Sequence, residues 1–115
     1  MIGEAWRAVA ARVGDATGIT VSTDPSKLNP PCIVVEPPNV TAATAGAITC
    51  QSNVWLVSAQ PANVANTNWL LDNLELALNA LGENTADPVA YQAGPNSTFP
   101  AYRITTTYLV RRTTT

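Results

Sequence analysis

Residues 48–81 read ITCQSNVWLVSAQPANVANTNWLLDNLELALNAL, and this stretch contains the two patterns that decide the fold. In residues 48–59, apolar side chains at alternate positions share one face, and the opposite face begins with the polar residues Thr49, Gln51 and Asn53. This two-residue alternation predicts one long β-strand. The strand becomes apolar on both faces toward its end, and Pro61 terminates it. Residues 69–81 instead repeat apolar side chains at three- and four-residue steps, which predicts an amphipathic helix.

The predicted helix at residues 69–81, the second of the chain, has clear end signals and two apolar stripes. Asn66 or Thr67 can cap its first turn, and Gly82 can close its last one. The main stripe contains Leu70, Leu71, Leu74, Ala77, Leu78 and Leu81. At about 100° per residue, a narrower stripe on the opposite side contains Trp69, Leu76 and Ala80. Either both stripes are buried within the monomer, or a neighbouring subunit covers the narrower one, because exposed apolar stripes usually mark contacts.

The segments on either side continue the mixture of strand and helix. The sequence predicts a first helix over residues 3–13, followed by strands over residues 19–22, 32–36, 88–92 and 102–112. It also predicts a loop, or an arm between two hairpin strands, over residues 39–47, and a turn-rich connection over residues 93–100. The order favours an α+β fold with a mostly antiparallel sheet of four to five strands and two main helices packed on it. We expect one domain over residues 1–112 and a frayed tail over residues 113–115.

Composition limits the classes of function. Apolar residues make up 46% of the 115 positions, which is enough for a hydrophobic core and argues against a disordered chain. Charged residues make up only 12%, about half the usual share, as is common where neighbouring subunits cover the surface. The net charge is −2, and six basic side chains do not form the clusters that nucleic-acid binding needs.

Side chains that carry chemistry are scarce. The chain has no histidine, and therefore lacks the commonest general base and the commonest metal ligand. Cys32 and Cys50 are too isolated to indicate a zinc site, and Glu36 has no second carboxylate nearby with which to form an acid–base pair. We therefore expect no enzymatic activity, no cofactor and no metal site.

Two further expectations concern the cellular environment. Met1 leads directly into an amphipathic pattern rather than a secretory signal, so we expect assembly in a reducing cytoplasm, with Cys32 and Cys50 as free thiols. No apolar run approaches the roughly 18 residues that a membrane-spanning helix needs, so we expect no membrane partner.

The order of segments resembles that of the tail terminator proteins of long non-contractile-tailed bacteriophages, most closely those of phages that infect actinobacteria. An amphipathic N-terminal helix is followed by the proline-flanked hydrophobic strand NPPCIVVEPP at residues 29–38. A long polar strand at residues 49–57 and a leucine-rich helix at residues 69–81 come next. The segment PAYRI at residues 100–104 is similar to the start of the family's final strand. The resemblance covers nearly the whole chain in order.

The resemblance implies a structural virion protein at the junction of tail and head. Such a subunit forms a homo-oligomeric ring, typically hexameric, that caps the head-proximal end of the tail tube and stops its polymerisation. Its partners are the tail tube protein and the head–tail connector, and DNA passes through the ring without specific binding. In a hexamer the charge of −2 per chain would sum to about −12, which disfavours tight DNA binding.

The resemblance also suggests which residues make contacts. A ring needs two different surfaces on each subunit, and we expect the stripe of Trp69, Leu76 and Ala80 to form one of them. Contacts to the tube or the connector are expected from Val40, Thr41, Thr44, Asn96, Phe99, Arg111 and Arg112. Two alternatives remain: another neck component, such as a head–tail stopper or tail-completion protein, and a small monomeric module that binds a ligand in a tryptophan-lined groove.

Overall fold

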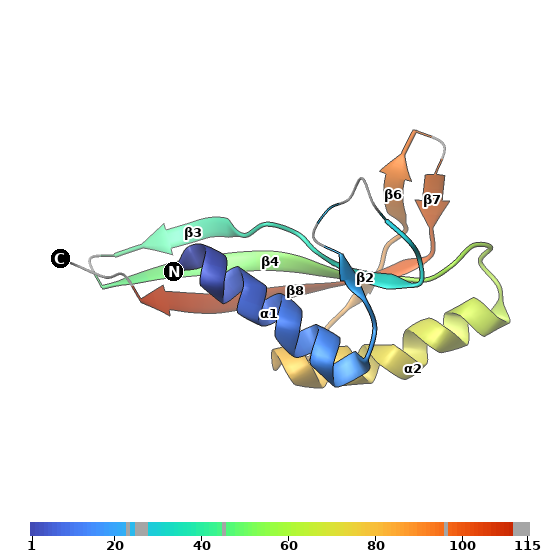
Figure 1. Ribbon diagram of the computed structural model, residues 1–115, viewed down its shortest axis with the longest axis horizontal. Coiled ribbons are helices and arrows are strands. Elements are labelled where there is room, and N and C mark those ends of the chain that lie inside the picture. The colour runs from blue at the N-terminus through green and yellow to red at the C-terminus, as the bar shows by residue number, and fades with distance from the viewer. Residues whose placement is uncertain (23, 25–27, 45, 96, 112–115) are drawn as a thin grey trace.

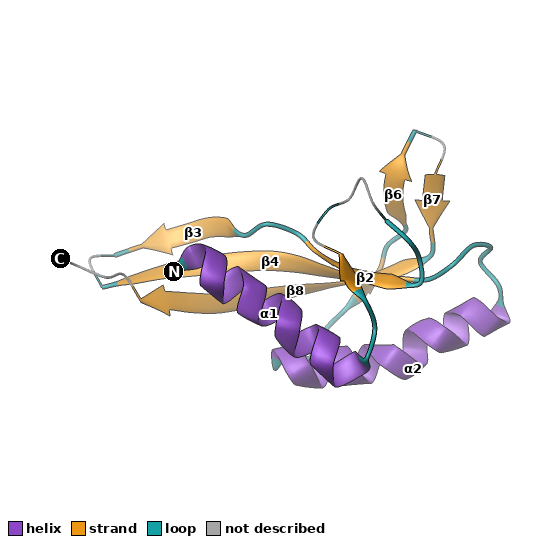
Figure 2. Cartoon of the chain, in the orientation of Figure 1, coloured by secondary structure: helices purple, strands orange, loops and turns teal. Residues whose placement is uncertain are grey.

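The computed structural model describes residues 1–22, 24, 28–44, 46–95 and 97–111. It contains two helices and a mixed sheet, so the predicted α+β class is confirmed (Figures 1 and 2). The elements follow the order α1 (Ile2–Thr17), β1 (Val21–Ser22), β2 (Cys32–Val35), β3 (Asn39–Ala43), β4 (Ala47–Val57), α2 (Val64–Leu81), β5 (Asp87–Pro88), β6 (Tyr91–Gly94), β7 (Ser97–Phe99) and β8 (Ala101–Arg111).

The main sheet has six strands, one or two more than predicted. Its path is β1-β2-β4-β8-β5, and β3 pairs with the other half of the β4 edge that β2 uses. Only β1 and β2 are parallel, and all other neighbours in this sheet are antiparallel. The central pair is β4 with β8, which stay in register from Ala47↔Arg111 to Val57↔Ala101. The extra strands are short ones that the sequence pattern does not mark.

The segment at residues 39–47, for which we predicted a loop or an arm, is largely a strand. β3 pairs with β4 from Asn39↔Gln51 to Ala43↔Ile48, with a register shift between Val40 and Ala42. Small residues have low strand propensity, but β4 supplies a long partner edge whose backbone groups must be paired. Tertiary pairing therefore overrides the local preference.

Helix α1 is one turn longer than predicted. It continues through Gly14 to Thr17, and Gly18 closes it in the left-handed conformation with φ of 70°. A Cβ atom at Gly14 would lie 3.0 Å from Val21 Cγ2, so this glycine allows the helix to lie close to β1. The buried residues of α1 are Val9, Ala10 and Val13, whose spacing places them on one face of the helix.

Helix α2 begins one turn before the predicted caps. Asn63, rather than Asn66 or Thr67, is the N-cap, and its side chain accepts a hydrogen bond from Asn66 N at 2.9 Å. The predicted end at Gly82 is confirmed, with φ of 67°. Of the predicted main stripe, Leu70, Ala77 and Leu81 are buried and Leu74 and Leu78 are partly buried, but Leu71 is exposed. Leu71 lies about 100° around the helix from Leu70, beyond the width that the sheet and α1 cover.

The core lies between the two helices and one face of the sheet. Its sheet residues are Ile33, Val35, Val54, Leu56 and Ile104, and α1 and α2 pack over them. Val54 and Leu56 share one face of β4, in agreement with the two-residue alternation predicted for residues 48–59. A second, smaller cluster lies on the opposite face, where Cys32, Val34, Val57 and Ala101 pack with partly buried residues that include Tyr91 and Phe99. Cys32 and Cys50 are buried free thiols, as predicted.

The region between α2 and β8 is more regular than predicted. The strand expected at residues 88–92 is split into β5, which pairs with β8, and β6, which pairs with β7 in a separate hairpin. The connection expected at residues 93–100 therefore contains β7. Residues 112–115, which are the last residue of the predicted strand and the whole of the predicted tail, lie outside the described residues.

The molecule is elongated, with extents of 52 × 30 × 21 Å. Figure 1 shows β3, β4 and β8 extending together to one end, whereas the β6–β7 hairpin projects from the other half and α2 runs along one side. We call this three-strand extension the arm; it consists of β3, residues 47–51 of β4 and residues 107–111 of β8. Within the described residues, no helix has the length and apolar character needed to span a membrane.

Candidate functional site

The expected interface residues on α2 do not share one environment. Trp69 is partly buried and packs against the main core, so the monomer already uses part of its surface. Leu76 is 45% exposed and faces away from the core. Ala80 is half-buried. Of the three, Leu76 is the residue that leaves a large apolar side chain open to solvent.

Other apolar side chains on α2 are also exposed. Val64 is 75% exposed and Leu71 is 47% exposed. At about 100° per residue, these two lie near each other on one margin of the buried stripe, whereas Leu76 lies on the opposite margin. Exposed apolar residues therefore lie on both sides of the buried stripe of α2. The sequence pattern had placed Leu71 within that stripe.

The arm brings together several of the residues expected to contact the tube or the connector. Val40 in β3 is 54% exposed, and Thr41 lies in the same strand. Thr44 follows β3, and its backbone nitrogen donates to Ala47 O at 2.8 Å. Ala47 is in register with exposed Arg111 at the end of β8, so the tip of the arm joins residues from distant parts of the chain.

The remaining expected contact residues lie elsewhere. Phe99 is in β7, where it is half-buried against the smaller cluster and far from the arm tip in the fold (Figure 1). Asn96 and Arg112 lie outside the described residues. The sequence analysis missed Leu109, which is 72% exposed on β8 although it is a large apolar residue. Leu109 alternates with the more buried residues of β8, and this two-residue alternation is the signal that could have identified it.

A polar and aromatic cluster, which the sequence analysis also missed, joins β2, β4, β8 and the hairpin. Trp55 Nε1 donates to Glu36 Oε1 at 2.7 Å, and the Trp55 ring meets Tyr91 edge to face with centroids 5.2 Å apart. The Arg103 guanidinium lies 5.7 Å from the centre of the Trp55 ring, and Arg103 Nη2 is 3.5 Å from Asp87 Oδ2. Burial, and then the negative charge of Glu36, raise the pKa of Tyr91.

A second contact at Glu36 connects the cluster to α1. Trp6 Nε1 donates to the backbone oxygen of Glu36 at 3.0 Å. Two tryptophans therefore donate to one residue, one to its side chain and one to its main chain. This arrangement holds the start of the loop after β2 in place between the helix layer and the hairpin.

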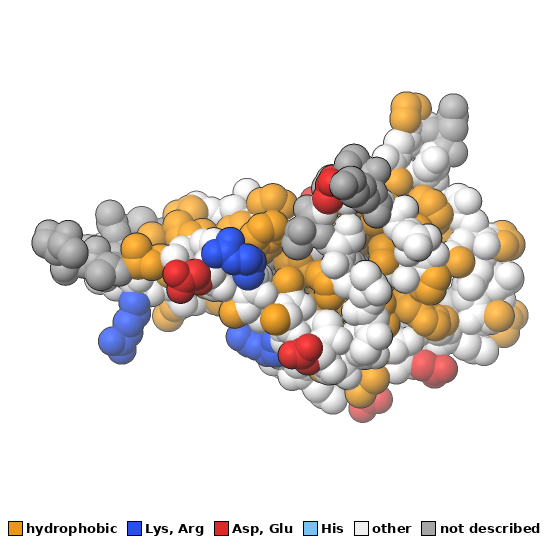
Figure 3. Space-filling model, viewed as in Figure 1, with side chains coloured by type: hydrophobic (Ala, Val, Ile, Leu, Met, Phe, Trp, Pro, Cys, Tyr) orange, Lys and Arg blue, Asp and Glu red, His pale blue; other side chains and the backbone are white. Residues whose placement is uncertain are grey.

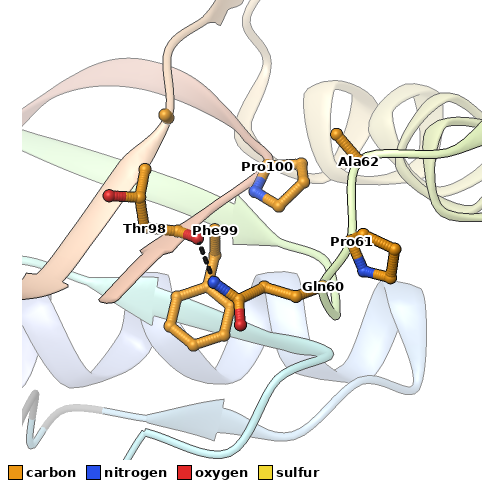
Figure 4. A pocket seen from close by; sticks show the side chains of 7 residues that line it. Gln60, Pro61, Ala62, Thr98, Phe99 and Pro100 are labelled. Atoms are coloured by element: carbon orange, nitrogen blue, oxygen red, sulfur yellow. Dashed lines mark hydrogen bonds between the residues drawn. The ribbon is translucent and has the colours of Figure 1, made fainter. Parts of the chain in front are cut away.

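Two open pockets lie on the hairpin side of the molecule. The first, of about 430 Å³, is mostly apolar and lies beside Phe99; it is lined by Gln60, Pro61, Ala62, Ala90, Thr98, Phe99 and Pro100 (Figure 4). The Gln60 side-chain amide donates to the Thr98 carbonyl across it. The second, of about 360 Å³, is polar and is lined by Glu36, Pro37, Asn39, Gln51, Asn53 and Thr105. Within the described part of the chain, no group of three or more His, Cys, Asp or Glu side chains is placed to hold a metal.

Comparisons with protein-family models and with curated proteins give no match. The family resemblance therefore depends on the order of segments and on the proline-flanked strand.

Proposed function

We propose that this protein is a structural subunit that assembles into a ring, hexameric in the family it resembles, and caps the head-proximal end of a phage tail tube. The proposal is supported by the resemblance in segment order over nearly the whole chain. In this role the ring stops tube polymerisation, contacts the tube protein on one side and contacts the head–tail connector on the other. The protein acts in the virion, at the tail–head junction.

The observation that carries the proposal is the distribution of exposed apolar side chains on a surface with few charges. Val64 and Leu76 on α2, and Val40 and Leu109 on the arm, are between 45% and 75% exposed. Figure 3 shows hydrophobic atoms spread over one face with few charged side chains between them. Covering such side chains stabilises an assembly by about 25 cal/mol per Å² of apolar area.

The two groups of exposed residues lie on different elements. A head-to-tail ring requires two different surfaces on each subunit, one for each neighbour. The outer side of α2 and the edges of the arm are separate exposed surfaces that neighbouring subunits can cover. A passage for DNA fits the weak charge, because Arg103 is already paired with Asp87 and the sheet face around it is mostly uncharged.

The test is the mass of the purified protein by light scattering over a range of concentrations, with and without tail tube protein. We expect a closed ring, either alone or in the presence of the tube. Leu76→Asp should abolish the ring and leave a folded monomer, because a charge cannot be desolvated without a partner at an apolar interface. Asn68→Asp, which adds the same charge at another exposed position of α2, is the matched control.

Two results would contradict this proposal. A protein that remains monomeric at every concentration and ignores the tube protein is not a ring-forming neck component. A ring that survives Leu76→Asp would remove this side of α2 from the interface. Electron microscopy of the virion then distinguishes a terminator from another neck component by the position of the ring.

The alternative of a small binding module is favoured by one observation, the apolar pocket beside Phe99. That pocket, rather than a groove lined by tryptophans, would hold an apolar ligand. The module predicts a stable monomer whose Trp55 fluorescence changes on binding, because Tyr91 connects this tryptophan to the hairpin beside the pocket.

A further inference from the structure

The arm has two open edges. On one side, β8 is covered by β5 only at Tyr102 and Arg103. On the other side, β3 pairs with β4 alone. Within the described residues, no strand pairs with β8 beyond Arg103 on its outer side or with the outer side of β3. Figure 2 shows β3 and β8 as the outer strands of the arm, on either side of β4.

The backbone groups that face the open edge of β8 can be identified. Ser58 N donates to Pro100 O from the β4 side, and Val89 N donates to Ala101 O from the β5 side. Because successive residues of a strand turn their backbone groups to opposite sides, the odd-numbered residues of β8 face outward. Thr105, Thr107 and Leu109 therefore present their N–H and C=O groups to the open edge.

The backbone groups on the outer edge of β3 can be identified in the same way. Glu36 N donates to Asn53 O, so the odd-numbered residues of β4 face β2 and β3. Gln51 is in register with Asn39, which places the backbone groups of Asn39 toward β4 and those of Val40 away from it. The arm of each subunit therefore has two unpaired edges, that of β3 on one side and that of β8 on the other.

The β8 edge lacks the features that keep edge strands apart. From Ile104 to Val110 it carries neither a charged residue nor proline, and its in-register pairing with β4 contains no bulge. It consists largely of β-branched and aromatic residues, which favour strand pairing. Such an edge is a template for another strand.

We propose that the β8 edge of one copy pairs with the β3 edge of the next copy, so that the sheet continues from subunit to subunit. Head-to-tail pairing uses both open edges of every subunit, and closure of the ring leaves none. The inference deepens the proposed function, because it rests on assembly of the chain into a ring.

The alternative is a two-fold pairing of β8 with β8, and β5 limits its length. An antiparallel pair centred on Thr107 would bring Arg111 of the second copy to the position beside Arg103 that Asp87 of β5 already occupies, so the two β8 strands could pair only over residues 105–109. β3 is five residues long and carries no charge, so it fits within the open part of β8. Two-fold pairing would also leave both β3 edges open.

Cysteine cross-linking tests the pairing directly. Asn39 and Thr107 lie on the same sheet face, each in register with Gln51, and two strand spacings place them about 10 Å apart within one subunit, too far for a disulfide. Asn39→Cys is combined in turn with Thr105→Cys, Thr107→Cys and Leu109→Cys, and each single variant is the control. The native thiols are at most 2% exposed and stay out of the reaction in the folded protein.

Head-to-tail pairing predicts that at least one double variant gives a ladder of cross-linked oligomers under oxidation, whereas the single variants give none. A dimer from Thr107→Cys alone would establish two-fold pairing and overturn the proposal. A wild-type ring whose double variants all fail to cross-link would also overturn it, while leaving the proposed function intact. A chain that never assembles would contradict both.

A backbone variant provides an independent measurement. Thr107→Pro removes an N–H that faces the open edge and leaves the bonds between β8 and β4 in place. We expect the concentration at the midpoint of assembly to rise at least about tenfold, which corresponds to the loss of roughly one hydrogen bond per junction. Circular dichroism checks the fold, and assembly unchanged from the wild type would contradict the pairing.

Discussion

The hydrogen bond between Trp55 and the Glu36 carboxylate offers a quantitative test of how the hairpin side of the molecule is held. A hydrogen bond to a charged group contributes about 1.5–3 kcal/mol to stability, and a neutral one about 1 kcal/mol. Glu36 is only partly buried, so solvent screening places its bond to Trp55 at the lower end of the charged range. Because Glu36→Gln replaces a charged acceptor at about 1.5 kcal/mol by a neutral one at about 1 kcal/mol, we expect a coupling free energy of about 0.5 kcal/mol between Trp55→Phe and Glu36→Gln in a double-mutant cycle.

The single changes have different expected costs. Glu36→Gln keeps an acceptor oxygen and should cost about 0.5–1 kcal/mol. Trp55→Phe removes the donor and part of the ring that contacts Tyr91 and Arg103, and should cost about 2–3 kcal/mol. The assay is urea unfolding at neutral pH followed by far-ultraviolet circular dichroism, because the substitution removes one of the fluorescent tryptophans.

Trp6 provides an internal control for this cycle. Its indole donates to the Glu36 main-chain oxygen, which Glu36→Gln leaves unchanged. Trp6→Phe and Glu36→Gln should therefore be additive within about 0.3 kcal/mol. Coupling below about 0.3 kcal/mol in the Trp55 cycle would contradict this prediction, because the charge of Glu36 would then contribute nothing through Trp55.

Three further outcomes follow from burial in the main sheet. Leu56→Ala, at a fully buried position, should cost about 2–5 kcal/mol in urea unfolding, whereas Leu109→Ala at 72% exposure should change the stability of the monomer by less than about 0.5 kcal/mol. Tyr108→Phe should cost about 1–2 kcal/mol, because buried Ser52 loses its partner at 2.8 Å; a cost near zero would mean that Ser52 finds another. Burial raises the pKa of Tyr108 above its usual 10.0. The neutral Tyr108 side chain therefore contributes fully to stability below pH 10.0, and this contribution is lost as the pH rises through the raised pKa. Alkaline unfolding should thus be shallower in Tyr108→Phe.

The fold class could be predicted because periodicity is a local signal. The two-residue pattern of β4 and β8 and the three- and four-residue pattern of α2 each arise within one segment, and burial follows them closely. The free thiols and the end of α2 at Gly82 likewise depend on residue type and immediate neighbours. These predictions are confirmed.

The errors occur where the local signal is ambiguous. The asparagine-rich start of α2 offers several possible caps, and the choice of Asn63 depends on where the chain leaves β4. The small residues of β3 have no preference for a strand until β4 supplies an edge. The position of Leu71 depends on how much of α2 the sheet and α1 can cover.

The candidate sites depend more on long-range contacts. At the arm tip, Thr44 bonds to Ala47, which is in register with Arg111. The cluster at Glu36 brings together Trp6, Trp55 and Tyr91. No spacing rule relates such residues, because the register of β4 with its neighbours decides which of them meet.

The sequence by itself therefore determined the kinds of element, their order, the two apolar faces of the central strand and the weak charge of the surface. Only the tertiary structure decided the six-stranded sheet order, the open edges of β3 and β8, and the exposure of Leu76 and Leu109. The physical reason is that a hydrophobic pattern specifies which side chains avoid water. Pairing and packing between distant segments specify which strand edges, and which side chains beside a buried helix stripe, are left without a partner.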